Sequence, residues 1–242
     1  MFRRVSRRTV LASIVGFSAV TSVTAASFSV SPVRASLSAA KPTEALAIYN
    51  SGSEPAVVQL DVRAWSQDHG SDVLTSTREI LATPPIFTIA PGSKQVVRVG
   101  ARRSPDSTRE LAYRLFLQEV PPPPKPGFQG LRMALRLSIP VFIVPASAVP
   151  KLRWRAALES RGQLRIAIDN SGDAHVQIAN FSLVQSGRAV LNKYQVAAYV
   201  LAQQSRQWIV VPTGQVTPGS ALHVSAETDV GPVEADVAIE SP

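Results

Sequence analysis

Apolar residues alternate with polar or small ones from Leu131 to Val144, and this alternation is the clearest pattern in the chain. The apolar positions are Leu131, Met133, Leu135, Leu137, Ile139 and Val141. A period of two predicts a β-strand with one apolar face over 131–144. Pro140 cannot donate a backbone hydrogen bond, so we expect a sheet edge there. An apolar edge strand pairs readily with another chain. Either the protein's own second sheet covers this strand, or the strand is lent to a partner.

Short alternating segments separated by Gly, Pro, Asn and Asp turns predict an all-β chain. In the first half the expected strands are 27–37, 45–50, 55–65, 86–89, 94–100, 111–120 and 131–144. In the second half they are 151–158, 163–168, 176–184, 207–211, 221–226 and 233–239, with 194–201 either a strand or a short helical turn. Their number and spacing predict two immunoglobulin-like β-sandwiches in tandem.

The expected domain boundary lies in the proline-containing stretch 145–150. We therefore divide the chain into a domain over 26–147 and a second over 148–242. The four consecutive prolines at 121–124 favour extended backbone and are interpreted as the start of a surface loop. Asn-Ser-Gly occurs at both 50–52 and 170–172, in similar places of the two halves, which favours two related domains.

The N-terminus carries the features of a secretory signal peptide. Four arginines, at positions 3, 4, 7 and 8, precede an apolar run over 10–23 and the small residues before Ala26. We expect cleavage after Ala25 and export, by either the general or the twin-arginine route. The formal net charge of +8 falls to +4 without these arginines, so the charge does not indicate a nucleic-acid partner.

Residue content argues against catalysis. The chain has no cysteine, which excludes a disulfide, a thiol nucleophile and cysteine metal ligands. Its three histidines, His69, His175 and His223, lack metal-ligand spacing and are expected at the surface or in loops. We therefore predict no enzyme activity, no cofactor and no metal, although a carboxylate pair assembled in space stays open. The tryptophans, Trp65, Trp154 and Trp208, are widely spaced and are expected in the core rather than in a sugar site.

Arginines interrupt several apolar strands. Arg34 and Arg114 lie within such segments, and Arg132 and Arg136 fall on the polar side of the 131–144 strand, where we expect them to face solvent. A guanidinium in an apolar setting needs a partner and can bind a carboxylate through two hydrogen bonds. A chain terminus is one such carboxylate.

Four segments, in order, resemble the PapD-like periplasmic chaperones of the chaperone–usher pathway. They are Ser31-Pro32-Val33-Arg34, the "TPPIFTIAPGSKQVVR" stretch at 83–98, the "YRLFLQEVP" stretch at 113–121, and the alternating strand at 131–145. PapD is itself a known example of the immunoglobulin-like sandwich, and its family uses donor-strand complementation.

The resemblance implies two such domains in a boomerang arrangement, a periplasmic location and a chaperone that folds pilus subunits. The donor strand would insert Leu131, Met133, Leu135 and Leu137 into the subunit. Arg34 would bind the subunit's C-terminal carboxylate in the cleft between the domains. A pilus subunit and an outer-membrane usher are the expected partners, and self-association of the free protein through this strand stays open.

One departure from the family concerns the second anchor, for which the family has a lysine late in the donor strand. Pro140 aligns with that lysine. Arg114, Arg98 and Arg136 are the candidate replacements, and Arg114 is favoured because its strand is expected to be adjacent. The departure suggests a divergent branch, such as chaperones for subunits like spore coat protein U.

The alternative is a secreted two-domain structural or adhesin protein with the same fold. A pilus subunit would carry its own donor extension at the mature N-terminus. Here the segment 26–37 is short and leads directly into the first strand.

Overall fold

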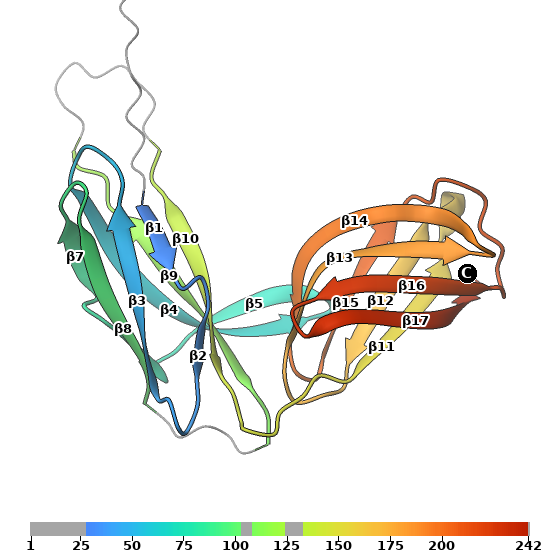
Figure 1. The fold of residues 1–242 in the computed structure, drawn as a ribbon, viewed down its shortest axis with the longest axis horizontal. Helices are drawn as coiled ribbons and strands as arrows, with labels where there is room; N and C mark the ends of the chain where they lie inside the picture. Colours follow the sequence, from blue (N-terminus) through green and yellow to red (C-terminus); the bar gives the residue numbers. More distant parts are fainter. Residues whose placement is uncertain (1–27, 103–107, 124–132, 242) are drawn as a thin grey trace, which may run out of the picture.

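The computed structural model describes residues 28–102, 108–123 and 133–241, which form two β-lobes meeting at an angle (Figure 1). The strands of the N-terminal lobe are β1 (Phe28–Ser31), β2 (Ala35–Leu37), β3 (Thr43–Asn50), β4 (Ala56–Asp68), β5 (Ser71–Ser76), β6 (Ile80–Thr83), β7 (Ile86–Ile89), β8 (Lys94–Ala101), β9 (Leu111–Glu119) and β10 (Arg136–Ile143). Those of the C-terminal lobe are β11 (Leu152–Leu158), β12 (Leu164–Asn170), β13 (Val176–Gln185), β14 (Arg188–Val200), β15 (Gln204–Val210), β16 (Ala221–Thr228) and β17 (Gly231–Glu240).

The prediction of an all-β fold in two immunoglobulin-like units is confirmed. Within the described residues the one helical element is a short 3₁₀ turn, Ser160–Gly162, and no helix is long and apolar enough to cross a membrane. The segment 194–201, left open between strand and helical turn, belongs to β14 up to Val200. Strands β5 and β6 were not predicted, since β5 is exposed on both faces and so shows no alternation.

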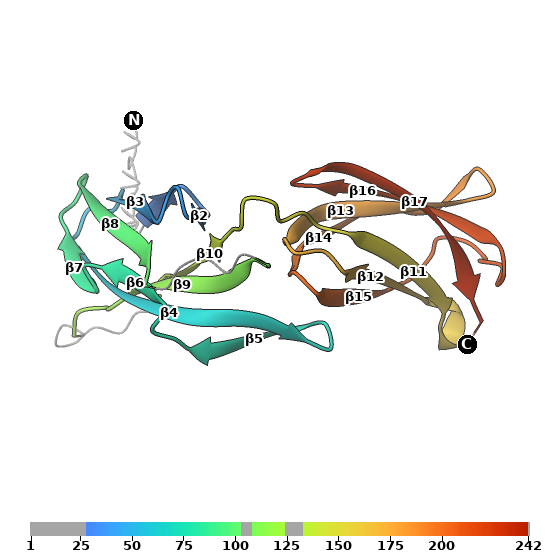
Figure 2. The same ribbon diagram turned by 90° about the horizontal axis from the view of Figure 1, so that it is seen from below.

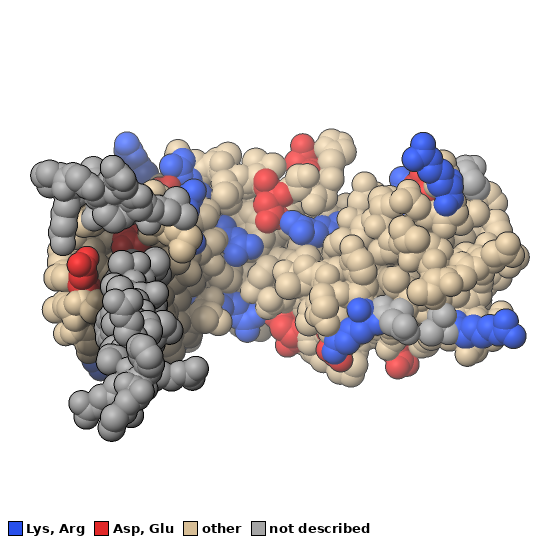
Figure 3. All heavy atoms as spheres, turned by 90° about the horizontal axis from the view of Figure 1, so that it is seen from above, with Lys and Arg blue, Asp and Glu red and all other residues tan. Residues whose placement is uncertain are grey.

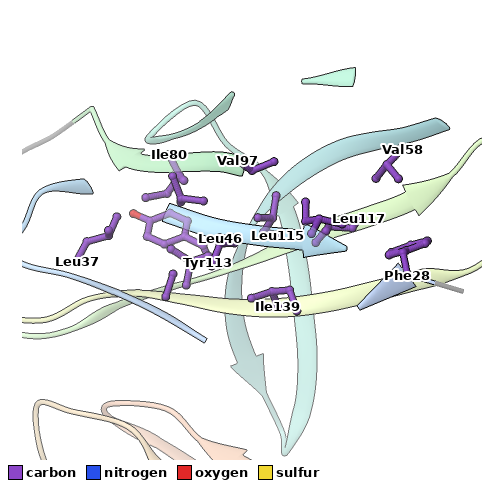
Figure 4. Packing of buried hydrophobic residues seen from close by; sticks show 14 of the residues in the cluster. Phe28, Leu37, Leu46, Val58, Ile80, Val97, Tyr113, Leu115, Leu117 and Ile139 are labelled. Atoms are coloured by element: carbon purple, nitrogen blue, oxygen red, sulfur yellow. The ribbon is translucent and has the colours of Figure 1, made fainter. Parts of the chain in front are cut away.

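The N-terminal lobe is a sandwich of two sheets. One sheet has the order β1-β3-β8-β6, and the other has the order β2-β10-β9-β4-β5 with β7 also paired to β4. Alternate residues of both sheets point inward, including Leu46, Val97, Leu115 and Ile139 (Figure 4). Each fully buried aliphatic side chain of this kind contributes roughly 1.5–3 kcal/mol to stability.

The expected first strand, 27–37, is divided between the two sheets. β1 pairs with β3 in the first sheet, whereas β2 pairs in parallel with β10 in the second. Pro32 lies between β1 and β2 and prevents a continuous ladder at this point. Arg34 consequently lies at the crossover between the two sheets.

The C-terminal lobe is built from a seven-stranded sheet with the order β14-β13-β16-β17-β11-β12-β15. The two halves of this sheet share one core, in which Trp154 packs edge-on against Phe181 at 5.8 Å between ring centroids. Trp154 was expected in the core, and 5% of it is exposed. Trp208 is partly buried against the same core.

The repeated Asn-Ser-Gly motif makes the same turn in both lobes. Asn50 and Asn170 are almost fully buried at strand ends. Each side chain accepts a hydrogen bond from the N–H two residues later, at 2.9 and 3.0 Å, and donates to the carbonyl four residues later, at 2.8 and 2.7 Å. An asparagine side chain that bonds its own following backbone is a standard way to fix a turn.

The lobes are joined by more than the covalent connection. Trp65 and Phe142 of the N-terminal lobe pack with Leu201 and Tyr199 of the C-terminal lobe in a small apolar cluster. The long β4–β5 hairpin also reaches towards the C-terminal lobe (Figure 2). These contacts define a junction whose exposed rim carries basic and acidic side chains close together (Figure 3).

Candidate functional site: the lobe junction and an open strand edge

The first five of the eight residues of β10 have an open edge. β10 pairs with β9 along its whole length, but β2 pairs only with its last part, Val141–Ile143. In the part of the chain that the structure describes, no strand pairs with Arg136–Pro140 on that side. The edge expected at Pro140 is therefore present, and main-chain groups on the β2 side of this segment are available to another strand.

The predicted donor residues differ in their surroundings. Leu131 lies outside the described residues. Met133 is 65% exposed, whereas Leu135 and Leu137 are partly buried against the lobe's own core. Glu119 holds this segment extended, because its carboxylate accepts from the N–H of Leu135 at 3.0 Å and its own N–H donates to the carbonyl of Leu135 at 2.9 Å.

Arg114 projects from the outer face of the sheet, because its neighbours Tyr113 and Leu115 point into the core. Its guanidinium carbon lies 3.6 Å from the centre of the Trp65 ring. Such a stack stabilises a cation that is partly removed from water. Burial lowers the pKa of Arg114 from its ordinary value, but a guanidinium stays charged in proteins.

Arg34 lies at the β1–β2 crossover and reaches across to the C-terminal lobe. Its guanidinium donates to a carboxylate oxygen of Asp229 at 2.7 Å, and its side chain remains 41% exposed. Burial raises the pKa of Tyr199, and the nearby Arg34 and Arg114 oppose this shift. The two predicted anchors are thus brought together around Tyr199 at the lobe junction.

The other two arginines proposed as substitutes for the missing lysine lie elsewhere. Arg98 is on the outer face of the first sheet, since Val97 and Val99 on either side of it are buried in the core. Arg136 lies at the start of β10 with its guanidinium 4.2 Å from the centre of the Phe116 ring. Arg132 lies outside the described residues. Arg114 is the only one of the three candidates near Tyr199.

The histidines were expected at the surface or in loops, and His175 lies in the loop between β12 and β13, although its side chain is only 10% exposed. His175 belongs to the C-terminal lobe, yet its Nδ1 lies 2.6 Å from Glu110 of the N-terminal lobe. Its ring stacks on Phe142 at 3.7 Å between centroids. His69 and His223 are exposed or half-exposed, as expected.

Sequence reasoning also missed the roles of Trp65 and Tyr199. Trp65 is buried as expected, but it packs at the junction, 5.4 Å from the Tyr199 ring, and not in the core of its own lobe. No local pattern marks these residues, because each becomes a neighbour of the others only when the two lobes pack. The described residues contain no group of three His, Asp or Glu side chains placed to hold a metal ion.

Comparison with known proteins identifies the class. Residues 27–149 match the family model described as pili and flagellar-assembly chaperone, PapD N-terminal domain, which covers half of the chain. The chain therefore belongs to this family of assembly chaperones, which is periplasmic and is not an enzyme family. A search of curated proteins found no match.

Solved chaperone structures share the fold over nearly their whole length. The CsuC chaperone in its complex with CsuE, from the archaic Csu pili of Acinetobacter baumannii, is 21% identical with a TM-score of 0.67, covering 88% of this chain and 99% of that one. The SafB chaperone of Salmonella enterica, in complex with the SafA pilin, is 18% identical with a TM-score of 0.61, covering 89% and 98%. The Escherichia coli chaperone DraB is 19% identical with a TM-score of 0.60, covering 88% and 97%.

These comparisons favour the chaperone over the alternative of a secreted structural or adhesin protein. The similar structures are chaperones, two of them determined with a bound pilin or tip subunit. The protein is a pilus-assembly chaperone of the PapD family.

Proposed function

We propose that the chaperone holds one pilus subunit by lending it the strand that leads into β10. The single observation that supports this is the open edge of Arg136–Pro140, which continues towards the exposed side chain of Met133. Main-chain hydrogen bonds to this edge would give affinity, and alternate apolar side chains would fill the subunit's pockets. Leu131, Met133, Leu135 and Leu137 are the inserted residues in this proposal.

Arg34 and Arg114 would bind the subunit's C-terminal carboxylate. Both carry permanent charge, both lie near Tyr199, and a guanidinium offers paired donors to a carboxylate. This contact would fix the register of the inserted strand, because the terminus of the subunit then has one position relative to β10. The Trp65 ring under Arg114 holds one of the two donors in place.

The remaining steps follow from the family. The signal peptide, residues 1–25, would be removed on export, leaving a subunit-holding domain over 26–147 and a second domain over 148–242. The chaperone would then deliver its subunit to an outer-membrane usher. The CsuC chaperone of archaic Csu pili supports a client of a divergent type, such as a subunit like spore coat protein U.

A periplasmic pull-down tests this function. Tagged chaperone is recovered from cells that express the neighbouring genes, and copurifying chains are identified by mass spectrometry. We expect a small β-rich subunit in a ratio near one to one, which is lost when Leu135 is replaced by Glu. Recovery of the chaperone alone, or as a self-associated oligomer, would contradict the proposal.

A further inference from the structure

Arg34 is already bonded to a carboxylate within the free protein. One oxygen of Asp229 accepts from the Arg34 guanidinium at 2.7 Å. The other oxygen accepts from the backbone N–H of Gln177 at 2.8 Å, so the carboxylate is held in a fixed direction. Asp229 lies in the turn between β16 and β17, and this pair therefore joins the two lobes.

The His175 side chain also lies near the Asp229 carboxylate but makes no hydrogen bond to it. His175 Nε2 is 3.7 Å from the Asp229 oxygen that Arg34 binds, which is too long for a hydrogen bond. This nitrogen is buried and has no hydrogen-bond partner. Burying an unpaired polar nitrogen is costly, and such a group in a native protein calls for an explanation.

The surroundings of His175 favour a proton on both ring nitrogens. The groups that face it are Glu110 at Nδ1, Asp229 at Nε2, the Phe142 ring and Tyr199, with Arg34 beyond Asp229. Burial lowers the pKa of His175, but the two carboxylates outweigh it and the pKa is raised. The Nε2–H of the imidazolium then points at the Asp229 oxygen that already accepts a hydrogen bond from Arg34.

We propose that Asp229 is an internal stand-in for the subunit's carboxylate. It occupies Arg34 while the chaperone is free, and it turns to His175 Nε2 when a subunit carboxylate takes Arg34. This inference rests on the proposed function of Arg34 as an anchor. His175 is then a positioning residue, since it receives the displaced Asp229 and so lowers the cost of freeing Arg34.

The exchange raises the number of ion pairs at the junction from two in the free protein to three with a subunit bound. In the free protein Arg34 binds Asp229, and His175 binds Glu110 alone. With a subunit bound, Arg34 would bind the incoming carboxylate and His175 would bridge Glu110 of one lobe and Asp229 of the other. His175 Nε2, which has no acceptor in the free protein, then has one.

A crystal structure of the Arg34→Ala variant at pH 6 tests the exchange without any subunit. We expect the distance from His175 Nε2 to the nearer Asp229 oxygen to fall from 3.7 Å to a hydrogen-bonded value of about 2.8 Å. Arg114→Ala is the matched control, because it removes a nearby charge and leaves the Arg34–Asp229 bond intact. A distance unchanged in Arg34→Ala would overturn the proposal.

Affinity for the subunit recovered in the pull-down gives a second test. Asp229→Asn keeps an acceptor for the Gln177 N–H and removes the charge that competes for Arg34. Since partly exposed ion pairs contribute little, we expect subunit binding to tighten by about two- to fivefold. Equal or weaker binding by Asp229→Asn would count against the stand-in role. If Arg34→Ala binds the subunit as tightly as the parent protein, the anchor assignment fails, whereas the crystal distance still decides the exchange.

Discussion

Arg114 lies directly opposite Pro140 in the antiparallel pairing of β9 with β10. Side chains of directly opposed residues project from the same face of a sheet, with Cβ atoms about 5 Å apart. From the resemblance to the family, we expect Pro140 to stand where other members have their donor-strand lysine. The side chain of Arg114 therefore leaves the sheet next to the position that the lysine would occupy. Its guanidinium stacks there on the Trp65 ring.

The first prediction concerns this exchange of anchors. Arg114→Ala should weaken subunit binding by about 10- to 100-fold, because a hydrogen bond to a charged group contributes roughly 1.5–3 kcal/mol. Adding Pro140→Lys to that variant should restore part of the lost affinity, as measured by titration calorimetry with the purified subunit. Arg98→Ala, on the outer face of the other sheet, is the control and should bind normally. Full binding by Arg114→Ala would exclude it as the second anchor.

The second prediction tests the donor strand at its most exposed apolar position. Met133→Glu should abolish subunit capture, because a charge would enter an apolar pocket of the subunit. The chaperone's own stability should change by less than about 0.5 kcal/mol, since this side chain is exposed in the free protein. Ala134→Glu alters the adjacent exposed residue and should leave capture intact. Copurification is the measurement, and equal loss by both variants would contradict a face-specific insertion.

The sequence predicted most of the fold because burial and alternation coincide along its strands. Leu46 and Ile48, or Val97 and Val99, point into the core at a period of two, and such segments were found with small errors at their ends. β5 was not predicted because all its residues are exposed, so it has no buried face and its sequence shows no alternation.

The candidate site was only partly predictable. Arg34 and Arg114 could be found because a charge inside an apolar strand is unusual wherever it occurs. His175, Asp229 and Tyr199 could not, since their sequence neighbours carry no signal and the contacts depend on how two separate lobes pack. The distance in sequence between Glu110 and His175 is 65 residues, and only the assembled junction brings them together.

The third prediction concerns Gln67, which connects the lobes through backbone groups. Its side-chain amide donates to the carbonyl of Tyr199 at 2.9 Å, and its oxygen accepts from the N–H of Leu201 at 3.1 Å. Gln67→Ala leaves these groups without their partner, so the free energy of unfolding should fall by about 1–3 kcal/mol. Denaturant unfolding measures this change.

Gln59→Ala is the matched control for Gln67, because it lies on the same strand with its side chain exposed. It should change stability by less than about 0.5 kcal/mol. A loss of the same size in both variants would mean that the bonds of Gln67 to the C-terminal lobe add nothing to stability.

The fourth prediction is a dependence of stability on pH that arises from His175. Its pKa is raised in the folded protein, so its stabilising contribution is fully present below the unfolded value of about 6.5. That contribution is lost as the pH rises through the folded pKa. Burial raises the pKa of Asp229, but His175, the Gln177 N–H and Arg34 lower it further, to about 2, so this group stays ionised and adds no slope between pH 6 and 9. The Tm should therefore fall across this range.

Circular dichroism at pH values from 6 to 9 measures this slope, and two variants assign it. His175→Gln should flatten the decline in Tm, because glutamine cannot take a proton and the two carboxylates then face an uncharged group at every pH. His69→Gln replaces a histidine whose side chain is 93% exposed, and its slope should match that of the parent protein. If the Tm of His175→Gln falls as steeply as that of the parent protein, the proton that produces the slope does not lie on His175.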